Sequence, residues 1–477
     1  MRTLLRSHTS TARRGMLYRD MLHRGTPYLP ESDGAGATSA AVRLRPADRG
    51  FVNFARKNAS FYVRAVRGGS PGWRLTPAPP SLTRKRMNLK GKLAIAGLGV
   101  TAQGKVYDRS HVGFAVEAVR LALADAGLER EDLDGLLLNP GLAWGTAAMG
   151  SFMLQQALGL RNLRLSAAMN LGGATAGAMV QQAALAIAAG MCTTVACVFS
   201  DRPLKPPEEQ RGRGEGSGSA ASYAFARGLD AAYGQFGINA MYAMVARRHM
   251  HVYGTTQDHL GAVAVAQRRW ANMNAAAQFH DRPLTLAEYH ASRWVVEPFH
   301  VLDCCLVSNG GIAVIVTSAE RARSLRRPPV YLWGMGQGHP GGEPAETLTS
   351  GAVLAGATAL RMAGVEPRDV DVCELYDCYT FTVLVTLEDY GFCAKGESGP
   401  FVAAGHTAPG GSLPVNTGGG QLSSSYMWGM TPLAEAVLQA RGEAGDRQVA
   451  RRDVVLVSGN GGLLSTHSTL VLSPLPS

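Results

Sequence analysis

The sequence has few charged residues, few aromatic residues, few cysteines and no long uninterrupted apolar run. Charged residues make up 17% and aromatic residues 7% of the 477 positions, whereas 46% are hydrophobic, which argues against a disordered chain. Seven cysteines are too few for a disulfide scaffold and, with no secretory signal visible, predict a reducing, cytoplasmic setting. The most apolar stretch, residues 176–199, is rich in alanine and contains Gln181 and Gln182, so we expect no membrane span.

The positive charge is confined to one segment of the chain. Residues 1-86 hold 17 of the 47 Lys and Arg residues but only 4 of the 36 Asp and Glu residues, so the rest carries a net charge of −2. This distribution removes the main support for a nucleic-acid partner. The same segment is rich in Gly and Pro and shows no sustained helix or strand period. We expect a basic extension before Met87 that is disordered or spurious; a targeting segment or an interaction arm is the alternative.

The rest of the sequence alternates between predicted strands and predicted helices, which favours α/β layers. At about residues 202-290 the alternation is interrupted by a segment that begins with Pro203, Pro206 and Pro207. We expect a loop insertion there, followed by helices. The predicted strands are residues 93–97, 133–138, 194–199, 314–317 and 330–334, and the predicted helices are residues 111–126 and 174–190.

A short pattern recurs at a fixed distance along the chain. The pattern Ala-Gly-x-Glu-x-x-Asp-x-Asp of residues 126–134 returns 237 positions later in residues 363–371. Five identities in register predict a duplicated unit, in which a helix end, a turn and a strand start are repeated. We therefore expect two similar α/β halves, residues 87-327 with the insertion and residues 328-477 without it.

Two motif-like stretches carry no chemistry on their own. Residues 99–105 follow a predicted strand and nearly match a phosphate-binding loop, but Val106 stands where a Ser or Thr would hold Mg²⁺. Cys304 and Cys305 are adjacent in the chain and cannot easily chelate one ion. We therefore expect neither a nucleotide site nor a metal site.

Two other segments, both in the second half, have the composition of a ligand site. Residues 373–379 (CELYDCY) end a predicted strand, and residues 416–429 (NTGGGQLSSSYMWG) lead into a predicted helix. Glycine-rich turns at strand ends let a ligand approach the backbone closely. Taken alone, each tyrosine of these segments could equally be an amphipathic core residue with its hydroxyl satisfied.

With these segments in place, residues 92–475 resemble the thiolase superfamily, in the branch of the sterol-carrier-protein thiolases and lipid-transfer-protein-like enzymes. The His-Asp-Cys-Phe motif of that branch corresponds to residues 376–379. Its Asn-x-x-Gly-Gly-…-Gly-His-Pro-x-Gly pattern corresponds to residues 416–429. The resemblance implies a thiolase-like duplicated α-β-α-β-α sandwich with a loop insertion in the first half, and a homodimer formed through that half.

The catalytic residues of the thiolases are replaced in this chain. By the resemblance, Gly173 stands at the position of the nucleophilic Cys and Ser458 at that of the second Cys. Tyr376 replaces the oxyanion-hole Asn or His, and Tyr426 replaces the base His. A thiolase needs a thiolate to take the acyl group, so acyl transfer by the usual route is excluded. The chain is similar to a group with the same replacements, the thiolase-like steroid side-chain aldolases of bacteria.

The resemblance to those aldolases implies retro-aldol cleavage of a β-hydroxyacyl-CoA with a steroid side chain, in which CoA is part of the substrate and no other cofactor takes part. It also implies a small OB-fold companion subunit. One tyrosine would be the base and the other the acid, and backbone N–H groups near Gly173 and Gly461 would face the thioester oxygen. The open alternatives are an acyltransferase that lacks the usual Cys and a non-catalytic lipid- or acyl-CoA-binding protein. The expected site residues are Tyr376 and Tyr426 for catalysis and Gly173, Asn416, Gly419, Ser458 and Gly461 for substrate binding.

Overall fold

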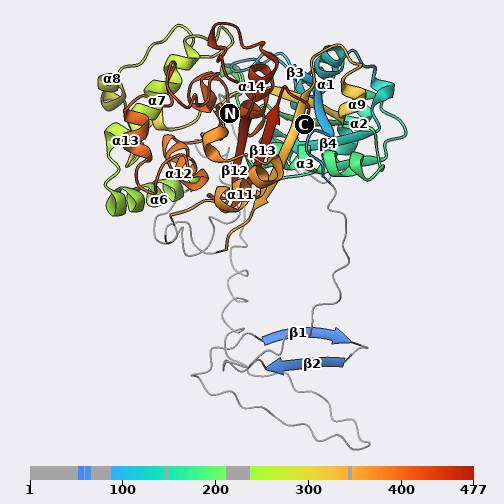
Figure 1. Ribbon diagram of the computed structural model, residues 1–477, viewed down its shortest axis with the longest axis horizontal. Coiled ribbons are helices and arrows are strands. Elements are labelled where there is room, and N and C mark those ends of the chain that lie inside the picture. Colours follow the sequence, from blue (N-terminus) through green and yellow to red (C-terminus); the bar gives the residue numbers. More distant parts are fainter. Residues whose placement is uncertain are drawn as a thin grey trace, which may run out of the picture. The chain divides into compact units, whose positions relative to one another are not determined.

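The computed structural model divides the chain into two units, Met1–Lys85 and Arg86–Ser477 (Figure 1). In the first unit, strand β1 (Val52–Lys57) pairs antiparallel with strand β2 (Ser60–Ala65). The sequence of residues 1-86 shows no sustained period, and two strands of six residues are too short to produce one. The rest of that segment lies outside the described residues. The structure describes residues 52–57, 60–65, 88–145, 149–210, 237–341, 346 and 348–477.

The second unit is organised around one nine-stranded mixed sheet. Its strand order is β11-β12-β13-β10-β3-β9-β6-β4-β5. Only two residue pairs, Val330 with Ile95 and Tyr331 with Ala94, join strand β10 of the second half to strand β3 of the first. The sheet therefore consists of two half-sheets that meet at a narrow seam. The strands are β3 (Leu93–Val100), β4 (Gly135–Pro140), β5 (Leu165–Ala168), β6 (Thr194–Asp201), β9 (Gly310–Ser318), β10 (Val330–Gly338), β11 (Val372–Glu374), β12 (Val455–Gly461) and β13 (Thr466–Ser473).

The predicted helices and strands are confirmed, with small shifts at their ends. The helix predicted at residues 111–126 is α1 (His111–Ala126), where the Ser110 side chain accepts a hydrogen bond from the N–H of Gly113. The helix predicted at residues 174–190 is α3 (Thr175–Ala188). The other helices of the two halves are α2 (Gly150–Leu158), α9 (Ala319–Ala322), α11 (Ala352–Ala363), α12 (Thr380–Tyr390), α13 (Ser398–Ala403) and α14 (Met430–Arg441).

The internal repeat is also present in the backbone. Gly127 and Gly364 end α1 and α11 with left-handed φ values of 73° and 67°. Each glycine is followed by a short 3-10 turn, η1 (Arg130–Asp132) or η6 (Pro367–Asp369), and both turns carry the same Glu/Asp capping box. The residues that repeat in the sequence are therefore those that end a helix and start the next strand.

The helices form layers on both sides of the half-sheets (Figure 1). Helices α3 and α14 contact strands of both halves and so lie between the two half-sheets. Helix α1 packs on β3, β6 and β9, and α11 packs on β10 and β13. The outer helices approach closely, since a Cβ at Gly97 or Gly334 would overlap the carbonyl oxygen of Ala122 or Ala359. The resulting order is the α-β-α-β-α arrangement expected from the sequence.

The insertion in the first half lies beside helices of the second half (Figure 1). Helix α7 contacts α12, α13 and the turn η7 (Gly420–Ser424). Helix α6 is tied to α12 by a buried pair in which His249 Nε2 and Glu388 Oε2 are 3.0 Å apart. Residues 211–236, expected to be irregular, lie outside the described residues. Between β6 and β9 the structure has α4 (Pro207–Gln210), α6 (Gly237–Tyr253), α7 (Gln257–Ala271), α8 (Leu286–Ala291), β7 (Trp294–Val296) and β8 (Phe299–His300).

In the described part of the chain, no helix combines the length and the apolarity that a membrane crossing would need.

Removal of residues 1–86 should leave the second unit folded. Among the described residues, the buried apolar residues of its main core begin at Leu89 and all lie in the second unit. We expect a chain that starts at Met87 to unfold cooperatively at the same temperature as the full chain, as measured by circular dichroism. A lower or non-cooperative transition in the shorter chain would contradict this division into two units.

Candidate active site

Two tyrosines from separate segments of the second half meet at the candidate site. Tyr376 follows β11 and is buried, whereas Tyr426 lies in the loop before α14 and is half-buried. Their hydroxyl oxygens are 2.9 Å apart, which is a hydrogen-bond distance. Burial raises the pKa of Tyr376 well above its ordinary value of 10, so this hydroxyl keeps its proton at neutral pH. The structure thus brings together the two residues selected from the sequence for catalysis.

Gly173, at the start of α3, lies directly against the Tyr376 ring. A Cβ atom at Gly173 would come within 2.5 Å of Cε2 and Cζ of Tyr376 and of the carbonyl oxygen of Asn460. Carbon atoms that are not bonded do not approach so closely, so any side chain at position 173 requires the Tyr376 ring to move. The ring occupies the space into which a cysteine at position 173 would extend.

The turns that lead into α3 and α14 have the same construction. Thr175 Oγ1 accepts a hydrogen bond from the N–H four residues earlier at 2.8 Å, and Thr431 Oγ1, 256 positions later, does the same at 2.9 Å. In both turns the residue that follows this N–H donor has a positive φ, 58° at Gly172 and 48° at Trp428. A Cβ at Gly429 would overlap a backbone carbonyl at the start of α3. The two helix starts are therefore packed against each other at the site.

Polar links tie the strand end that carries Tyr376 to the segment that carries Tyr426. Asn416, expected to bind substrate, takes part in these links with a left-handed φ of 52°. Burial raises the pKa of Asp377 to about 7. The hydrogen bonds that its carboxylate accepts from backbone N–H groups act in the opposite direction and lower this pKa. Sequence reasoning missed Glu374 and Asp377, although Asp377 lies inside the motif. The links are the Thr417 hydroxyl to Glu374 Oε1 (2.7 Å), the Leu375 N–H to Asn416 Oδ1 (2.6 Å), and the N–H groups of Gln421 and Leu422 to Asp377 Oδ2 (2.9 and 3.3 Å).

Gly419 and Gly461 both lie where two backbone segments approach closely. Gly419 has a φ of 96°, and a Cβ there would lie 2.5 Å from the Cβ of Ala271 on α7. At Gly461, the last residue of β12, a Cβ would overlap the carbonyl oxygen of Leu171. Packing alone therefore requires glycine at both positions, and no contact in the structure assigns them a ligand.

Ser458 lies in a buried polar network of its own. Its Oγ is 2.7 Å from Nε2 of His467, which is also 3.1 Å from the hydroxyl of Tyr390. Burial lowers the pKa of His467 to about 3, so this imidazole is neutral. Among the hydrogen bonds of the described residues, none joins the Ser458 side chain to Tyr376 or Tyr426. The main chain of Ser458 does lie at the site, because its carbonyl oxygen accepts a hydrogen bond from the N–H of Tyr376 at 3.1 Å.

Thiols lie near the tyrosines but are not activated. The backbone N–H of Cys305 donates to the carbonyl oxygen of Cys378 at 3.0 Å, which places both residues beside Tyr376. Burial raises the pKa of Cys378 to about 12 and that of Cys305 well above its ordinary value. Thiols with such pKa values are not thiolates at neutral pH and are poor nucleophiles. In the described residues, no group of His, Cys, Asp or Glu side chains is arranged to hold a metal ion.

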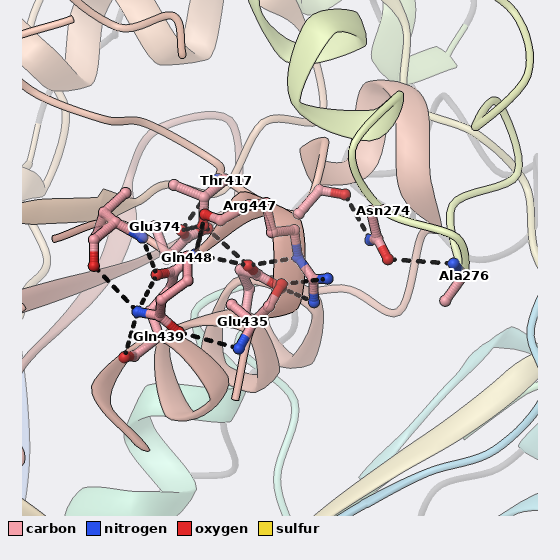
Figure 2. Close-up of polar contacts among 11 residues, drawn as sticks. Asn274, Ala276, Glu374, Thr417, Glu435, Gln439, Arg447 and Gln448 are labelled. Carbon is pink, nitrogen blue, oxygen red and sulfur yellow. Dashed lines mark hydrogen bonds and ion pairs between the residues drawn. The ribbon is translucent and has the colours of Figure 1, made fainter. Parts of the chain in front are cut away.

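A cavity of about 290 Å³ lies next to the polar links, and neither Tyr376 nor Tyr426 lines it. Figure 2 shows the network on its wall, in which Arg447 donates to both carboxylate oxygens of Glu435 at 2.9 and 3.0 Å. Burial and the charge of Glu435 raise the pKa of Glu374 well above its ordinary value. This wall therefore carries one carboxylate that is paired with Arg447 and one whose pKa is raised.

Gly173→Ala should destabilise the folded chain. The added methyl group has no space beside Tyr376, and overpacking of this kind costs about 1–3 kcal/mol. Urea unfolding of purified variants measures the loss. Gly113→Ala is a matched control, because the nearest side-chain atoms to a Cβ at that position of α1 are 3.5 Å away. Equal stability of Gly173→Ala and the wild type would show that the ring does not fill this space.

Comparison with known proteins agrees with this geometry. Residues 341–474 match the family described as thiolase C-terminal domain-like. The chain is 39% identical over 389 residues to a steroid side-chain-cleaving aldolase of Thermomonospora curvata, covering 78% of this chain and 96% of the relative. It is 36% identical to the 17-hydroxy-3-oxo-4-pregnene-20-carboxyl-CoA lyase of Mycobacterium tuberculosis, covering 78% and 97%.

A solved structure described as an Ltp2-ChsH2(DUF35) aldolase superposes with a TM-score of 0.71 at 39% identity, covering 81% of this chain and 98% of that chain. Identity at this level over nearly the whole length of the relatives is sufficient to assign a family. The chain belongs to the thiolase superfamily, in the group that contains the steroid side-chain-cleaving aldolases.

Proposed function

We propose that this protein cleaves a carbon–carbon bond of a β-hydroxyacyl-CoA by a retro-aldol reaction, releasing a ketone or aldehyde and a shorter acyl-CoA. The observation that carries the proposal is the pair of hydroxyl groups of Tyr376 and Tyr426, 2.9 Å apart, at a site where Gly173 replaces a nucleophile. A retro-aldol reaction needs one group to take a proton and one to give a proton, and no covalent intermediate.

The two hydroxyl groups can pass protons along their hydrogen bond. Tyr426, half-buried, takes the proton of the substrate's β-hydroxyl as its own proton moves to Tyr376, and Tyr376 passes its own proton on to the α-carbon. In the same step the bond between the α- and β-carbons breaks and the β-carbon becomes a carbonyl. The electron pair of the broken bond, which has enolate character at the thioester, takes up the proton of Tyr376. Because burial raises the pKa of Tyr376 well above 10, this hydroxyl holds a proton to give at neutral pH, and no free phenolate is required.

The developing enolate oxygen needs positive partners. Helices α3 and α14 both begin at the site, and the start of a helix carries a partial positive charge. Backbone N–H groups near Gly173 and Gly461 are our candidates for the oxygen's hydrogen bonds. The proposal uses no metal ion and no cofactor other than the CoA of the substrate.

A steroid side chain is our proposed acyl group. The support comes from the two relatives, whose names specify a steroid side chain and a pregnene carboxyl-CoA. An acyltransferase is the weaker candidate, because Gly173 offers no thiol and the pKa of Cys378 is raised to about 12. A non-catalytic acyl-CoA-binding protein would bind the same substrate without converting it. A cytoplasmic location is part of the proposal, since all seven cysteines are free, and cell fractionation tests it.

We also propose two protein partners. A homodimer would form through the first half, where β5 is an edge strand and α2 exposes Phe152 and Met153 to about half of their surface. Exposed apolar side chains beside an open strand edge are typical of an interface between subunits. A DUF35 companion is proposed because the solved relative is an Ltp2-ChsH2(DUF35) aldolase. An OB fold for this companion is what the family resemblance implies.

Tyr376→Phe and Tyr426→Phe should each lower the cleavage rate by about 10²- to 10⁴-fold, the usual contribution of a general acid or base. Each change removes one hydroxyl and keeps the ring, so folding should persist. The double variant should lose far less than the product of the two single losses, because the two groups act as one relay. Single-turnover cleavage of a β-hydroxyacyl-CoA, with product analysis by mass spectrometry, measures this.

Tyr331→Phe is the matched control, since Tyr331 is a buried tyrosine on β10. Wild-type turnover in both single variants would remove the tyrosine pair from the mechanism and favour the binding-protein alternative. An acyl thioester isolated on any cysteine would favour acyl transfer instead.

Phe152→Glu should convert the purified dimer into a monomer, because a charge at this half-exposed position would be buried in the interface. Leu354→Glu, at an equally exposed position on α11, should leave the mass unchanged. Light scattering measures both masses. A wild-type chain that is monomeric at micromolar concentration, or a Phe152→Glu dimer, would contradict this interface.

A further inference from the structure

The side-chain amide of Asn460 is buried and only half of it is hydrogen-bonded. Asn460 lies on β12 and is 1% exposed. Its Nδ2 donates to the hydroxyl of Tyr242 at 3.1 Å, whereas its Oδ1 has no hydrogen-bond partner in the described part of the chain. Buried polar atoms are nearly always partnered, so an unpartnered amide oxygen calls for a ligand or a water molecule.

The main chain of Asn460 lies beside the tyrosine pair. Its backbone carbonyl oxygen and the Cζ atom of Tyr376 both lie within 2.5 Å of the point that a Cβ of Gly173 would occupy. Tyr242, which the side-chain amide contacts, is close enough to Tyr376 to contribute to the raised pKa of that hydroxyl. Asn460 thus belongs to the wall of the site at the start of α3, on the strand that also carries Gly461.

The orientation of the amide follows from its neighbours. Tyr242 comes from helix α6 of the insertion, and its hydroxyl also hydrogen-bonds the thiol of Cys378. Nδ2 of Asn460 donates to the Tyr242 oxygen at 3.1 Å. The NH₂ end of the amide therefore faces Tyr242, and the end that faces away from it is the oxygen.

The turn after β12 is held in a costly conformation. Leu463 and Leu464 have φ values of 55° and 66°, which disfavour any residue other than glycine, and Ser465 N–H closes the turn on the carbonyl oxygen of Gly462 at 3.3 Å. Leu464 is fully buried, and its carbonyl oxygen accepts from the N–H of Gly351 at 2.9 Å. These contacts hold the turn, and with it the end of β12, in one conformation.

Asn460 Oδ1 is a hydrogen-bond acceptor and would repel the enolate oxygen. Its partner is therefore a hydrogen-bond donor on another part of the substrate. The pantetheine arm of a CoA thioester has an amide N–H two carbon atoms from the sulfur. We propose that Asn460 Oδ1 accepts a hydrogen bond from this amide N–H and so sets the position of the thioester beside Tyr376. The inference rests on the proposed acyl-CoA substrate, and it makes Asn460 a substrate-binding residue and Tyr242 the residue that positions it.

The test uses two stable thioether analogues of the acyl-CoA, one with the pantetheine amide intact and one with that amide replaced by an ester. Isothermal titration measures the affinity of both for the wild-type chain. The ester should bind about 3- to 10-fold more weakly, the range of one neutral hydrogen bond. Asn460→Ala should bind the amide analogue as weakly as the wild type binds the ester, with no further loss for the ester.

Asn239→Ala is the matched control. Asn239, also on α6, accepts a hydrogen bond from Tyr379, so the change removes a second Asn–Tyr bond of the same helix. This variant should keep the full difference between the two analogues. Equal binding of both analogues by the wild type, or the same difference in Asn460→Ala, would overturn the inference. A wild type that discriminates the analogues but does not cleave β-hydroxyacyl-CoA would contradict the proposed function and leave this inference standing.

Discussion

The space beside Gly173 holds one side chain, and the rest of the site depends on that limit. The ring of Tyr376 fills the space, so no residue with a Cβ fits at position 173 unless the ring moves. A cysteine at 173 and a tyrosine at 376 therefore exclude each other. Two replacements that are 203 positions apart in the sequence are one structural change. Close packing thus links the loss of a thiol nucleophile to the gain of a phenol.

Burying a phenol has consequences for the residues around it. A buried hydroxyl without a partner costs about 1–3 kcal/mol, and the hydrogen bond between Tyr376 and Tyr426 offsets that cost. This hydrogen bond forms only if the segment with Tyr376 and the segment with Tyr426 are held in a fixed relative position. The links from Glu374, Leu375 and Asp377 to residues 416–422 hold them there. The same burial raises the pKa of Tyr376, so a mechanism that passes protons between neutral hydroxyls suits this site better than one that needs a phenolate.

The duplicated fold and the tyrosine pair were predictable from the sequence, but the supports of the site were not. The repeat of residues 126–134 specifies caps and turns, which are local and therefore visible in a pattern. The family motifs showed that tyrosines replace the usual catalytic residues at positions 376 and 426. Asn460, Asp377 and Glu374 act through contacts between segments far apart in the chain, which no local pattern encodes. Ser458 was expected at the site, where its carbonyl oxygen accepts from the N–H of Tyr376, but no local pattern showed that its hydroxyl bonds His467.

The duplication also explains why the chemistry lies at one place. Each half builds the same turn before a helix, with a threonine cap and a positive φ, and the starts of α3 and α14 pack against each other. Two helix starts directed at one point concentrate positive potential where an enolate forms. The turns are alike in backbone and differ in side chains: Tyr426 precedes α14, and Asn170 holds the equivalent position before α3. The electrostatic support is therefore symmetric, whereas the proton relay comes from the second half alone.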